Sequence, residues 1–162
     1  MSAQDVSSSA WLAGFRGDAL TTAIAISLAE DPSSDPNAHC LNCAGVSEDS
    51  RGPWQINVNA HPQYASVDLY NPVLNAQAAY AISSGGTNFN PWSTFIYGTY
   101  KTYLAQAATL AASVSGSPPA STPAPPSSSL PSTYPPTLNP VKNPRVAVLA
   151  AFGLVAAVIV FS

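Results

Sequence analysis

The sequence DALTTAIAISLAE at residues 18–30 predicts a helix that is apolar on nearly every face. Its apolar and small residues recur at helical spacing: Leu20, Ala23, Ile24, Ser27 and Leu28. Asp18 stands near the N-terminal end, where an acidic side chain is favourable. Because the other faces are also mostly apolar, we expect this helix to be central and buried. It ends at Glu30, one of only two glutamates in the chain.

The neighbouring sequence predicts more helices and one long connection. Residues 72–84 read as a second helix, which is stopped by Gly85 and the glycine after it. Residues 92–112 predict a third helical region with aromatic side chains facing a core. Residues 31–50 are rich in Asp, Ser, Asn and Pro and predict a long loop. Residues 54–56 fit a short strand or a turn.

Composition divides the 162 residues into four segments. Residues 1–10 lack the charged and apolar regions of a signal peptide and are expected to form a disordered tail. Residues 11–112 are the only part able to fold as one compact domain. Residues 113–144 hold ten of the sixteen prolines and predict a disordered, Pro/Ser-rich linker. Residues 145–162 carry no charge after the first residue and predict a single transmembrane helix near the lower length limit.

The charge and the cysteines narrow the range of partners. Five basic residues and a net charge of −3 exclude a nucleic-acid footprint and favour a neutral polymer such as a polysaccharide. Cys40 and Cys43 form a C-x-x-C pair next to His39, which supplies too few ligands for a structural zinc site. No βαβ pattern supports a redox role. We interpret the pair as loop cysteines, open to a local disulfide, and predict no metal or cofactor.

Glu30 is the candidate general acid. A carboxyl at the end of an apolar helix loses solvation, which raises its pKa. The partial negative charge of the helix C-terminus and the neighbouring Asp31 act in the same direction. A raised pKa keeps a proton available near neutral pH, as a general acid requires. The alternative is an exposed glutamate at a helix end with no chemical role.

Four segments occur in a fixed order: AIAISLAED at 23–31, GPWQIN at 52–57, NAQAAYAI at 75–82 and NPWSTFIYGTY at 90–100. In this order and spacing the chain resembles the lysozyme-like domains of lytic transglycosylases and goose-type lysozymes, especially those carried by bacteriophage virions. The resemblance implies a mainly α-helical, lysozyme-like domain of the α+β superfamily with a sugar-binding cleft. In that family an apolar helix ends in the catalytic glutamate, which the resemblance assigns to Glu30.

The resemblance also implies a set of substrate-binding residues around the cleft: Gly52, Gln55, Asn57, Tyr97 and Tyr100. Gly52 and Gln55 would line its floor, and the two tyrosines would stand near the carboxylate or in the wall. Core packing is the alternative for both tyrosines, and it is the expectation for Trp54 and Trp92.

Asp31 departs from the family pattern, because lytic transglycosylases have Ser directly after the glutamate. Ser33 or Ser34 could substitute for it in space. A transglycosylase needs one glutamate, and the muramyl 6-hydroxyl attacks its own anomeric carbon to give a 1,6-anhydro product. A hydrolase would add a second carboxylate that activates water. The candidates lie on the acidic loop: Asp31, Asp35, Glu48 and Asp49. Of these, Asp31 and Asp49 are also expected to bind substrate. A solvated loop is the alternative for each, and the resemblance favours the transglycosylase outcome.

We therefore expect an enzyme that cleaves the β-1,4 bond between N-acetylmuramic acid and N-acetylglucosamine in the peptidoglycan glycan strand. The helix at 145–162 would anchor it to a lipid membrane, either the internal membrane of a virion or a host cell membrane. Local penetration of the cell wall during phage infection fits this architecture, with a tail-anchored cellular wall-remodelling enzyme as the alternative. A non-catalytic peptidoglycan-binding module and a structural virion membrane protein are the other interpretations.

Overall fold

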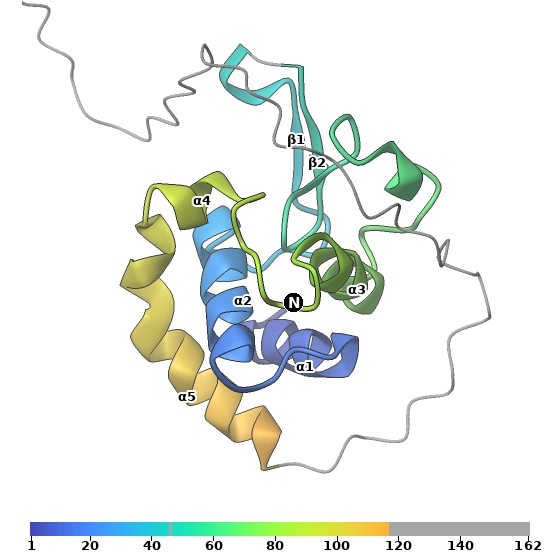
Figure 1. Ribbon diagram of the computed structural model, residues 1–162. Coiled ribbons are helices and arrows are strands. Elements are labelled where there is room, and N and C mark those ends of the chain that lie inside the picture. Colours follow the sequence, from blue (N-terminus) through green and yellow to red (C-terminus); the bar gives the residue numbers. More distant parts are fainter. Residues whose placement is uncertain (46, 117–162) are drawn as a thin grey trace, which may run out of the picture. The chain divides into compact units, whose positions relative to one another are not determined.

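A computed structural model of the chain describes residues 1–45 and 47–116 as a mainly helical domain with a small sheet (Figure 1). The α-helices are α1 (Ala3–Ala13), α2 (Gly17–Glu30), α3 (Pro72–Ile82), α4 (Ser93–Ile96) and α5 (Leu104–Ser115). The strands are β1 (His39–Leu41), β2 (Asp49–Arg51) and β3 (Ile56–Asn57). Three 3₁₀ segments complete the described elements: η1 (Cys43–Gly45), η2 (Pro62–Tyr64) and η3 (Thr99–Tyr103).

Helix α2 lies at the centre of the domain, as its sequence predicts. Leu20 and every residue from Ala23 to Leu28 are buried. The helix contacts α1, α4, α5 and η3, so its apolar faces all meet other elements. Each fully buried Leu or Ile side chain contributes about 1.5–3 kcal/mol. This burial fixes the position of Glu30, the last residue of the helix.

The predicted disordered tail at residues 1–10 is wrong, because residues 3–10 belong to α1 and Ser2 caps that helix. Ser2 and Asp5 form a capping box, in which each side chain accepts a hydrogen bond from the backbone of the other. Val6 and Ala10 are fully buried, and α1 packs against α2, α3 and α5. The serines suggest an unstructured segment, but the hydroxyl of Ser7 donates a hydrogen bond to the backbone carbonyl of Gln4 within the helix. Small side chains therefore allow close helix packing here.

The third helical region is interrupted. Gly98 adopts a left-handed conformation at φ +79° and separates α4 from η3, which leads into α5. Helix α5 continues to Ser115, and Val114 is buried. Gln4 of α1 and Ser113 exchange side-chain hydrogen bonds. The folded domain thus extends beyond the boundary predicted at residue 112.

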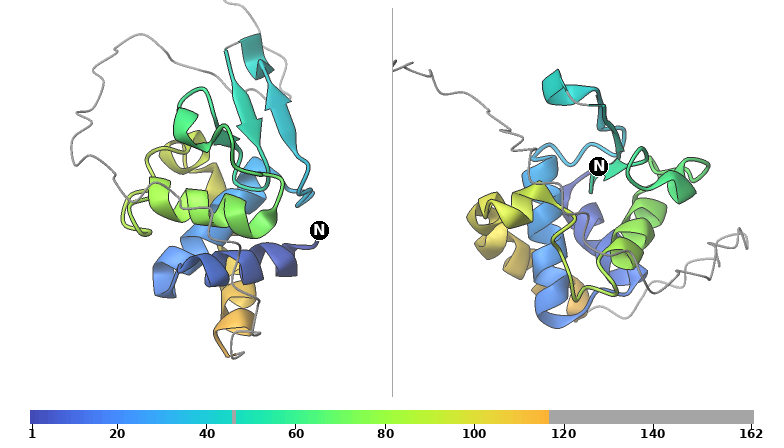
Figure 2. Two further views of the ribbon diagram at one scale, coloured as in Figure 1. Left: turned by 90° about the vertical axis from the view of Figure 1, so that its right-hand side faces the viewer. Right: turned by 45° about the horizontal axis from the view of Figure 1, so that its top comes forward.

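The segment predicted as a loop at residues 31–50 contains two strands. They pair antiparallel, with Cys40 opposite Ser50, and β2 pairs in turn with β3. Cys40 and Cys43 form a disulfide beside this hairpin. The hairpin stands at one end of the helical body (Figure 2). Three-residue strands carry too little alternation to be recognised in the sequence.

The predicted transmembrane helix at 145–162 lies outside the described residues, as does the predicted linker apart from its first four residues, 113–116. Within residues 1–45 and 47–116, no helix has the length and apolar character needed to cross a membrane.

A turn between β2 and β3 is fixed by buried hydrogen bonds. Asn75 of α3 accepts from the Trp54 backbone N–H and donates to the carbonyls of Arg51 and Leu69. The Trp54 indole donates to the carbonyl of Ala23 in α2. The Trp92 indole donates to the carbonyl of Trp54. Both tryptophans are buried core residues, as expected.

Gly52 is the position in this turn where a side chain does not fit. Its φ is +70°, and an added Cβ would lie 2.2 Å from the carbonyl oxygen of Leu69. We expect Gly52→Ala to lower the free energy of unfolding by about 3 kcal/mol or more, because backbone strain and overpacking add. Gly17→Ala is the matched control, since φ there is +53° and nothing lies within 4 Å of the added Cβ. It should cost about 1–2 kcal/mol. Equal losses in urea unfolding of the two variants would contradict the close approach at Gly52.

Candidate active site

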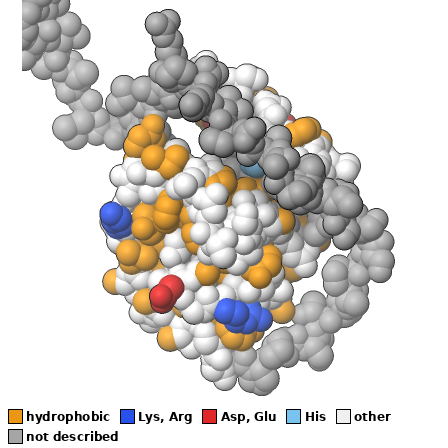
Figure 3. Space-filling view, viewed as in Figure 1, with side chains coloured by type: hydrophobic (Ala, Val, Ile, Leu, Met, Phe, Trp, Pro, Cys, Tyr) orange, Lys and Arg blue, Asp and Glu red, His pale blue; other side chains and the backbone are white. Residues whose placement is uncertain are grey.

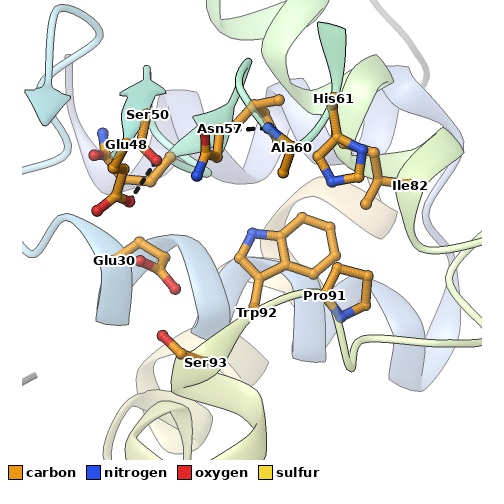
Figure 4. Close-up of a pocket in the computed structure, with 12 residues that line it drawn as sticks. Glu30, Glu48, Ser50, Asn57, Ala60, His61, Ile82, Pro91, Trp92 and Ser93 are labelled. Atoms are coloured by element: carbon orange, nitrogen blue, oxygen red, sulfur yellow. Dashed lines mark hydrogen bonds between the residues drawn. The ribbon is translucent and has the colours of Figure 1, made fainter. Parts of the chain in front are cut away.

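A cleft opens where α2 ends, between the hairpin and the segment before α4 (Figure 4). The volume of this cleft is about 180 Å³. One wall comes from the sheet and the chain after it: Glu48, Ser50, Gln55, Ile56, Asn57, Ala60 and His61. The other comes from the helices and the segment leading into α4: Glu30, Ile82, Pro91, Trp92 and Ser93.

Glu30 lies in this cleft, as the sequence predicts. Burial, the largest cause, raises the pKa of its carboxyl, and the negative charge of Glu48 raises it further. Hydrogen bonds from the side chain and the backbone of Thr94 lower the pKa, but the net direction is upward. A carboxyl of this kind holds its proton at a higher pH than an ordinary glutamate does, which suits a general acid.

Thr94 is a functional residue that the sequence analysis missed. Its Oγ1 donates a hydrogen bond of 2.7 Å to Oε1 of Glu30, although the two residues are 64 positions apart. The bond forms because the Trp92 indole anchors the chain just before α4 to the buried carbonyl of Trp54. The quoted NPWSTF segment contains Thr94, but no local pattern marks it as the partner of a distant carboxyl.

Asp31 does not line the cleft, which corrects the prediction that it binds substrate. It follows α2, and its carboxylate accepts hydrogen bonds from the backbone and side chain of Ser33 and from the backbone of Asp35. The carboxylate therefore stabilises the turn after the helix. The hydroxyl of Ser33 donates its hydrogen bond to Asp31. Among the described residues, neither Ser33 nor Ser34 forms a hydrogen bond with Glu30. Thr94 instead holds the carboxyl of Glu30.

Strand β2 turns alternate side chains to opposite faces. Ser50 is buried toward the cleft, where its Oγ donates a 2.6 Å hydrogen bond to Oε1 of Glu48. Asp49 lies on the other face. Its carboxylate binds Arg51 and His39, and these hydrogen bonds lower its pKa. Asp49 therefore does not line the cleft as expected, and Glu48 is the acidic-loop residue that enters it.

Two of the three candidates in the GPWQIN segment reach the cleft. Gln55 and Asn57 line it, while Gly52 is buried and does not. Nε2 of Gln55 donates to the carbonyls of Ala38 and Gly52. That leaves Oε1 of Gln55, which accepts no hydrogen bond from the described residues, as the atom able to meet a ligand.

Neither predicted tyrosine lines the cleft. Tyr97 follows α4 and is 61% exposed. Tyr100 packs against the core, with its ring stacked on Phe95 at a centroid distance of 4.9 Å. The prediction placed both near the carboxylate, and core packing is the correct description of Tyr100.

His61 forms the end of the cleft away from the two carboxyls, beside Ile82 and Pro91 (Figure 4). Burial lowers the pKa of its imidazole, which favours the neutral ring. Within residues 1–45 and 47–116, no group of His, Cys, Asp and Glu is arranged to hold a metal ion.

A helix-borne carboxyl of raised pKa, placed in a cleft beside a small antiparallel sheet, defines the lysozyme-like class of proteins. The sequence model of one family, described as a lysozyme-like domain, matches residues 7–94. The match spans more than half of the chain and includes every residue that lines the cleft, so the protein belongs to the lysozyme-like domain family. Peptidoglycan degradation, by glycoside hydrolase or transglycosylase chemistry, is the general activity that this membership indicates. No curated protein and no solved structure is similar enough to count as a match.

Thr94→Val tests the hydrogen bond to Glu30. Removing a donor that lowers the pKa of Glu30 raises that pKa further, so the alkaline limb of the pH–activity profile should move to higher pH. The maximal rate should fall about 10- to 100-fold, because the carboxyl loses its fixed orientation. Muropeptide release from purified sacculi across pH measures both effects.

Thr102→Val is the matched control for this variant. Thr102 is exposed on η3, so its loss should leave the pH profile and the rate unchanged. An unshifted alkaline limb in Thr94→Val would show that this hydrogen bond does not act on the proton donor.

Proposed function

We propose that this protein cleaves the β-1,4 glycosidic bond between N-acetylmuramic acid and N-acetylglucosamine in peptidoglycan, with Glu30 as the proton donor. The observation that supports it is a partly buried carboxyl of raised pKa in the cleft of a lysozyme-like domain. The glycan strand is the proposed partner, and no metal or organic cofactor takes part in the proposed reaction.

Glu30 gives its proton to the glycosidic oxygen as the bond to the anomeric carbon breaks. The carboxyl becomes a carboxylate during this step, and the hydrogen bond from Thr94 then becomes charge-assisted and stronger. An interaction that strengthens as the reaction proceeds lowers the barrier rather than only holding the substrate. Thr94 therefore acts as a positioning residue that also stabilises the carboxylate form of Glu30 left after proton transfer.

The lining of the cleft suits a neutral glycan. The amides of Gln55 and Asn57 provide polar groups, and Trp92 and Ile82 provide apolar surface. Among the described residues, two carboxyls and no Lys or Arg line the cleft, which disfavours a polyanion such as nucleic acid. On the face shown in Figure 3, the coloured charged side chains are few and scattered.

The products decide between the two possible reaction types. The family resemblance favours a transglycosylase, which leaves 1,6-anhydro ends, whereas a hydrolase leaves reducing ends. Mass spectrometry of muropeptides released from purified sacculi separates them. A non-catalytic binding module is the alternative function, and it would bind sacculi and release neither product.

Glu30→Gln tests the proposed donor. The amide keeps the shape of the side chain and can still accept from Thr94, but it has no proton of suitable acidity. We expect muropeptide release to fall about 10²–10⁴-fold or more. Thermal unfolding should stay close to that of the wild type, since no buried group loses its partner. Retained muralytic activity would assign the reaction to another residue, and a large loss of stability would make Glu30 structural.

We also propose that residues 145–162 anchor the enzyme to a membrane, either a virion internal membrane or a host cell membrane, and that it opens the cell wall locally during phage infection. The support is the sequence VAVLAAFGLVAAVIVFS at 146–162, which contains no charged residue. A tether of this kind keeps the domain close to the wall that it cleaves.

Ending the chain at residue 144 tests the anchor. The full chain should float with phosphatidylcholine vesicles in a density gradient, and the shortened chain should remain in the aqueous fraction. Because the cleft lies wholly within residues 30–93, the shortened chain should release muropeptides at the rate of the full chain in detergent. Vesicle binding that survives the deletion would place the membrane contact elsewhere.

A further inference from the structure

The cleft holds a second carboxyl, Glu48, that proton donation by Glu30 does not use. Glu48 directly precedes β2 and Glu30 ends α2, so the two carboxyls enter from different walls. Figure 4 shows them at the same end of the cleft, on either side of an open gap. A sugar bond lying in this gap would have one carboxyl on each side.

The local structure gives Glu48 a defined orientation. Ser50 is only 1% exposed, and its Oγ donates a 2.6 Å hydrogen bond to Oε1 of Glu48. The backbone carbonyl of Glu48 accepts from the N–H of Asn42, which fixes the main chain at this point. One carboxylate oxygen is thus engaged by Ser50, and no described residue donates to the other.

The cation nearest in sequence does not neutralise this carboxylate. Arg51 lies on the opposite face of β2 and binds Asp49 at both carboxylate oxygens. The negative charge of Glu48 instead acts on Glu30, where it is one of the two causes that raise the pKa. A second carboxylate beside a carboxyl of raised pKa is the usual pairing of a base with an acid.

Resting on the proposed function, we propose that Glu48 is the catalytic base of a hydrolytic reaction, accepting a proton from the water that attacks the anomeric carbon. Glu48 would then be the group that activates water, and the reaction would be hydrolysis rather than the intramolecular transglycosylase route.

The reaction needs only the glycan, one water molecule and the two carboxyls. Glu30 transfers its proton to the glycosidic oxygen, and the bond between that oxygen and the anomeric carbon breaks. The oxygen of water forms a bond to the anomeric carbon while one of its protons passes to Glu48. The products are a reducing end and a free hydroxyl. Glu30 is left as a carboxylate and Glu48 as an acid, and proton exchange with solvent restores both.

Other groups in the cleft are less suited to be the base. His61 lies at the opposite end, and Ser50, Ser93, Gln55 and Asn57 are not bases. The elements packed against α2 add no competing charge near Glu30. Helices α4 and α5 contain no charged residue. Lys101 of η3 and Asp5 of α1 do not contribute to the pKa of Glu30.

The test compares the wild type, Glu48→Gln and Glu48→Asp on purified sacculi in ¹⁸O-labelled water. The wild type should release reducing ends that carry ¹⁸O at the anomeric carbon. Glu48→Gln should lose these products about 10²–10⁴-fold, as expected when a general base is removed. Its residual activity should show an alkaline limb moved to lower pH, because the charge that raises the pKa of Glu30 is gone.

Glu48→Asp separates the role of Glu48 as a base from the effect of its negative charge on the pKa of Glu30. It keeps the negative charge but shortens the reach, so we expect the rate to fall while the alkaline limb stays near its wild-type position. Asp18→Asn makes the same change in net charge as Glu48→Gln, at the exposed far end of α2, and should behave as the wild type. Thermal unfolding of each variant identifies any that fail to fold.

The outcomes of this comparison are distinct. Wild-type products that end only in 1,6-anhydro groups would overturn the role of Glu48 and leave glycosidic cleavage by Glu30 intact. Reducing ends that form at the wild-type rate in folded Glu48→Gln would also overturn it. A wild type that releases no muropeptides would instead refute the proposed function itself.

Discussion

One buried amide, the side chain of Asn75, holds together the parts that build the cleft. Two of its three hydrogen bonds, with the Trp54 N–H and the Arg51 carbonyl, bind the turn between β2 and β3 to helix α3, and the third goes to the carbonyl of Leu69 before that helix. Trp54, fixed by this turn, bonds in turn to a carbonyl of α2 and accepts from Trp92. Leaving any of these buried groups unpaired costs about 1–3 kcal/mol. The network therefore sets where the sheet, helix α2 and the segment with Thr94 meet.

The sequence predicts the parts of this arrangement that depend on local pattern. Helix α2 and its terminal Glu30 follow from continuous apolar character, and α3 follows from Pro72 and the glycines after it. The family resemblance expects Gln55 and Asn57 at the cleft, and both residues line it. These features need no knowledge of which distant segments touch.

The remaining features depend on pairing between distant residues. Without the register of β1, β2 and β3, the acidic segment reads as a loop, and nothing distinguishes Glu48 from Asp49. Once the strands are known, the alternation of β2 decides which carboxylate enters the cleft. The expected position of Tyr97 was wrong for a related reason. The short helix α4 and the turn at Gly98 direct its side chain away from the cleft.

In its proposed role as proton donor, Glu30 must hold its proton until the bond begins to break and then release it readily. Burial against the core of α2 and the charge of Glu48 provide the first condition, because both raise the pKa of Glu30. Thr94 provides the second, because its hydrogen bond favours the carboxylate that forms. These opposing influences come from the central helix, the hairpin and the segment at α4. Since the hydrogen-bond network of Asn75 and Trp54 joins all three, the acidity of one carboxyl is a property of the whole fold.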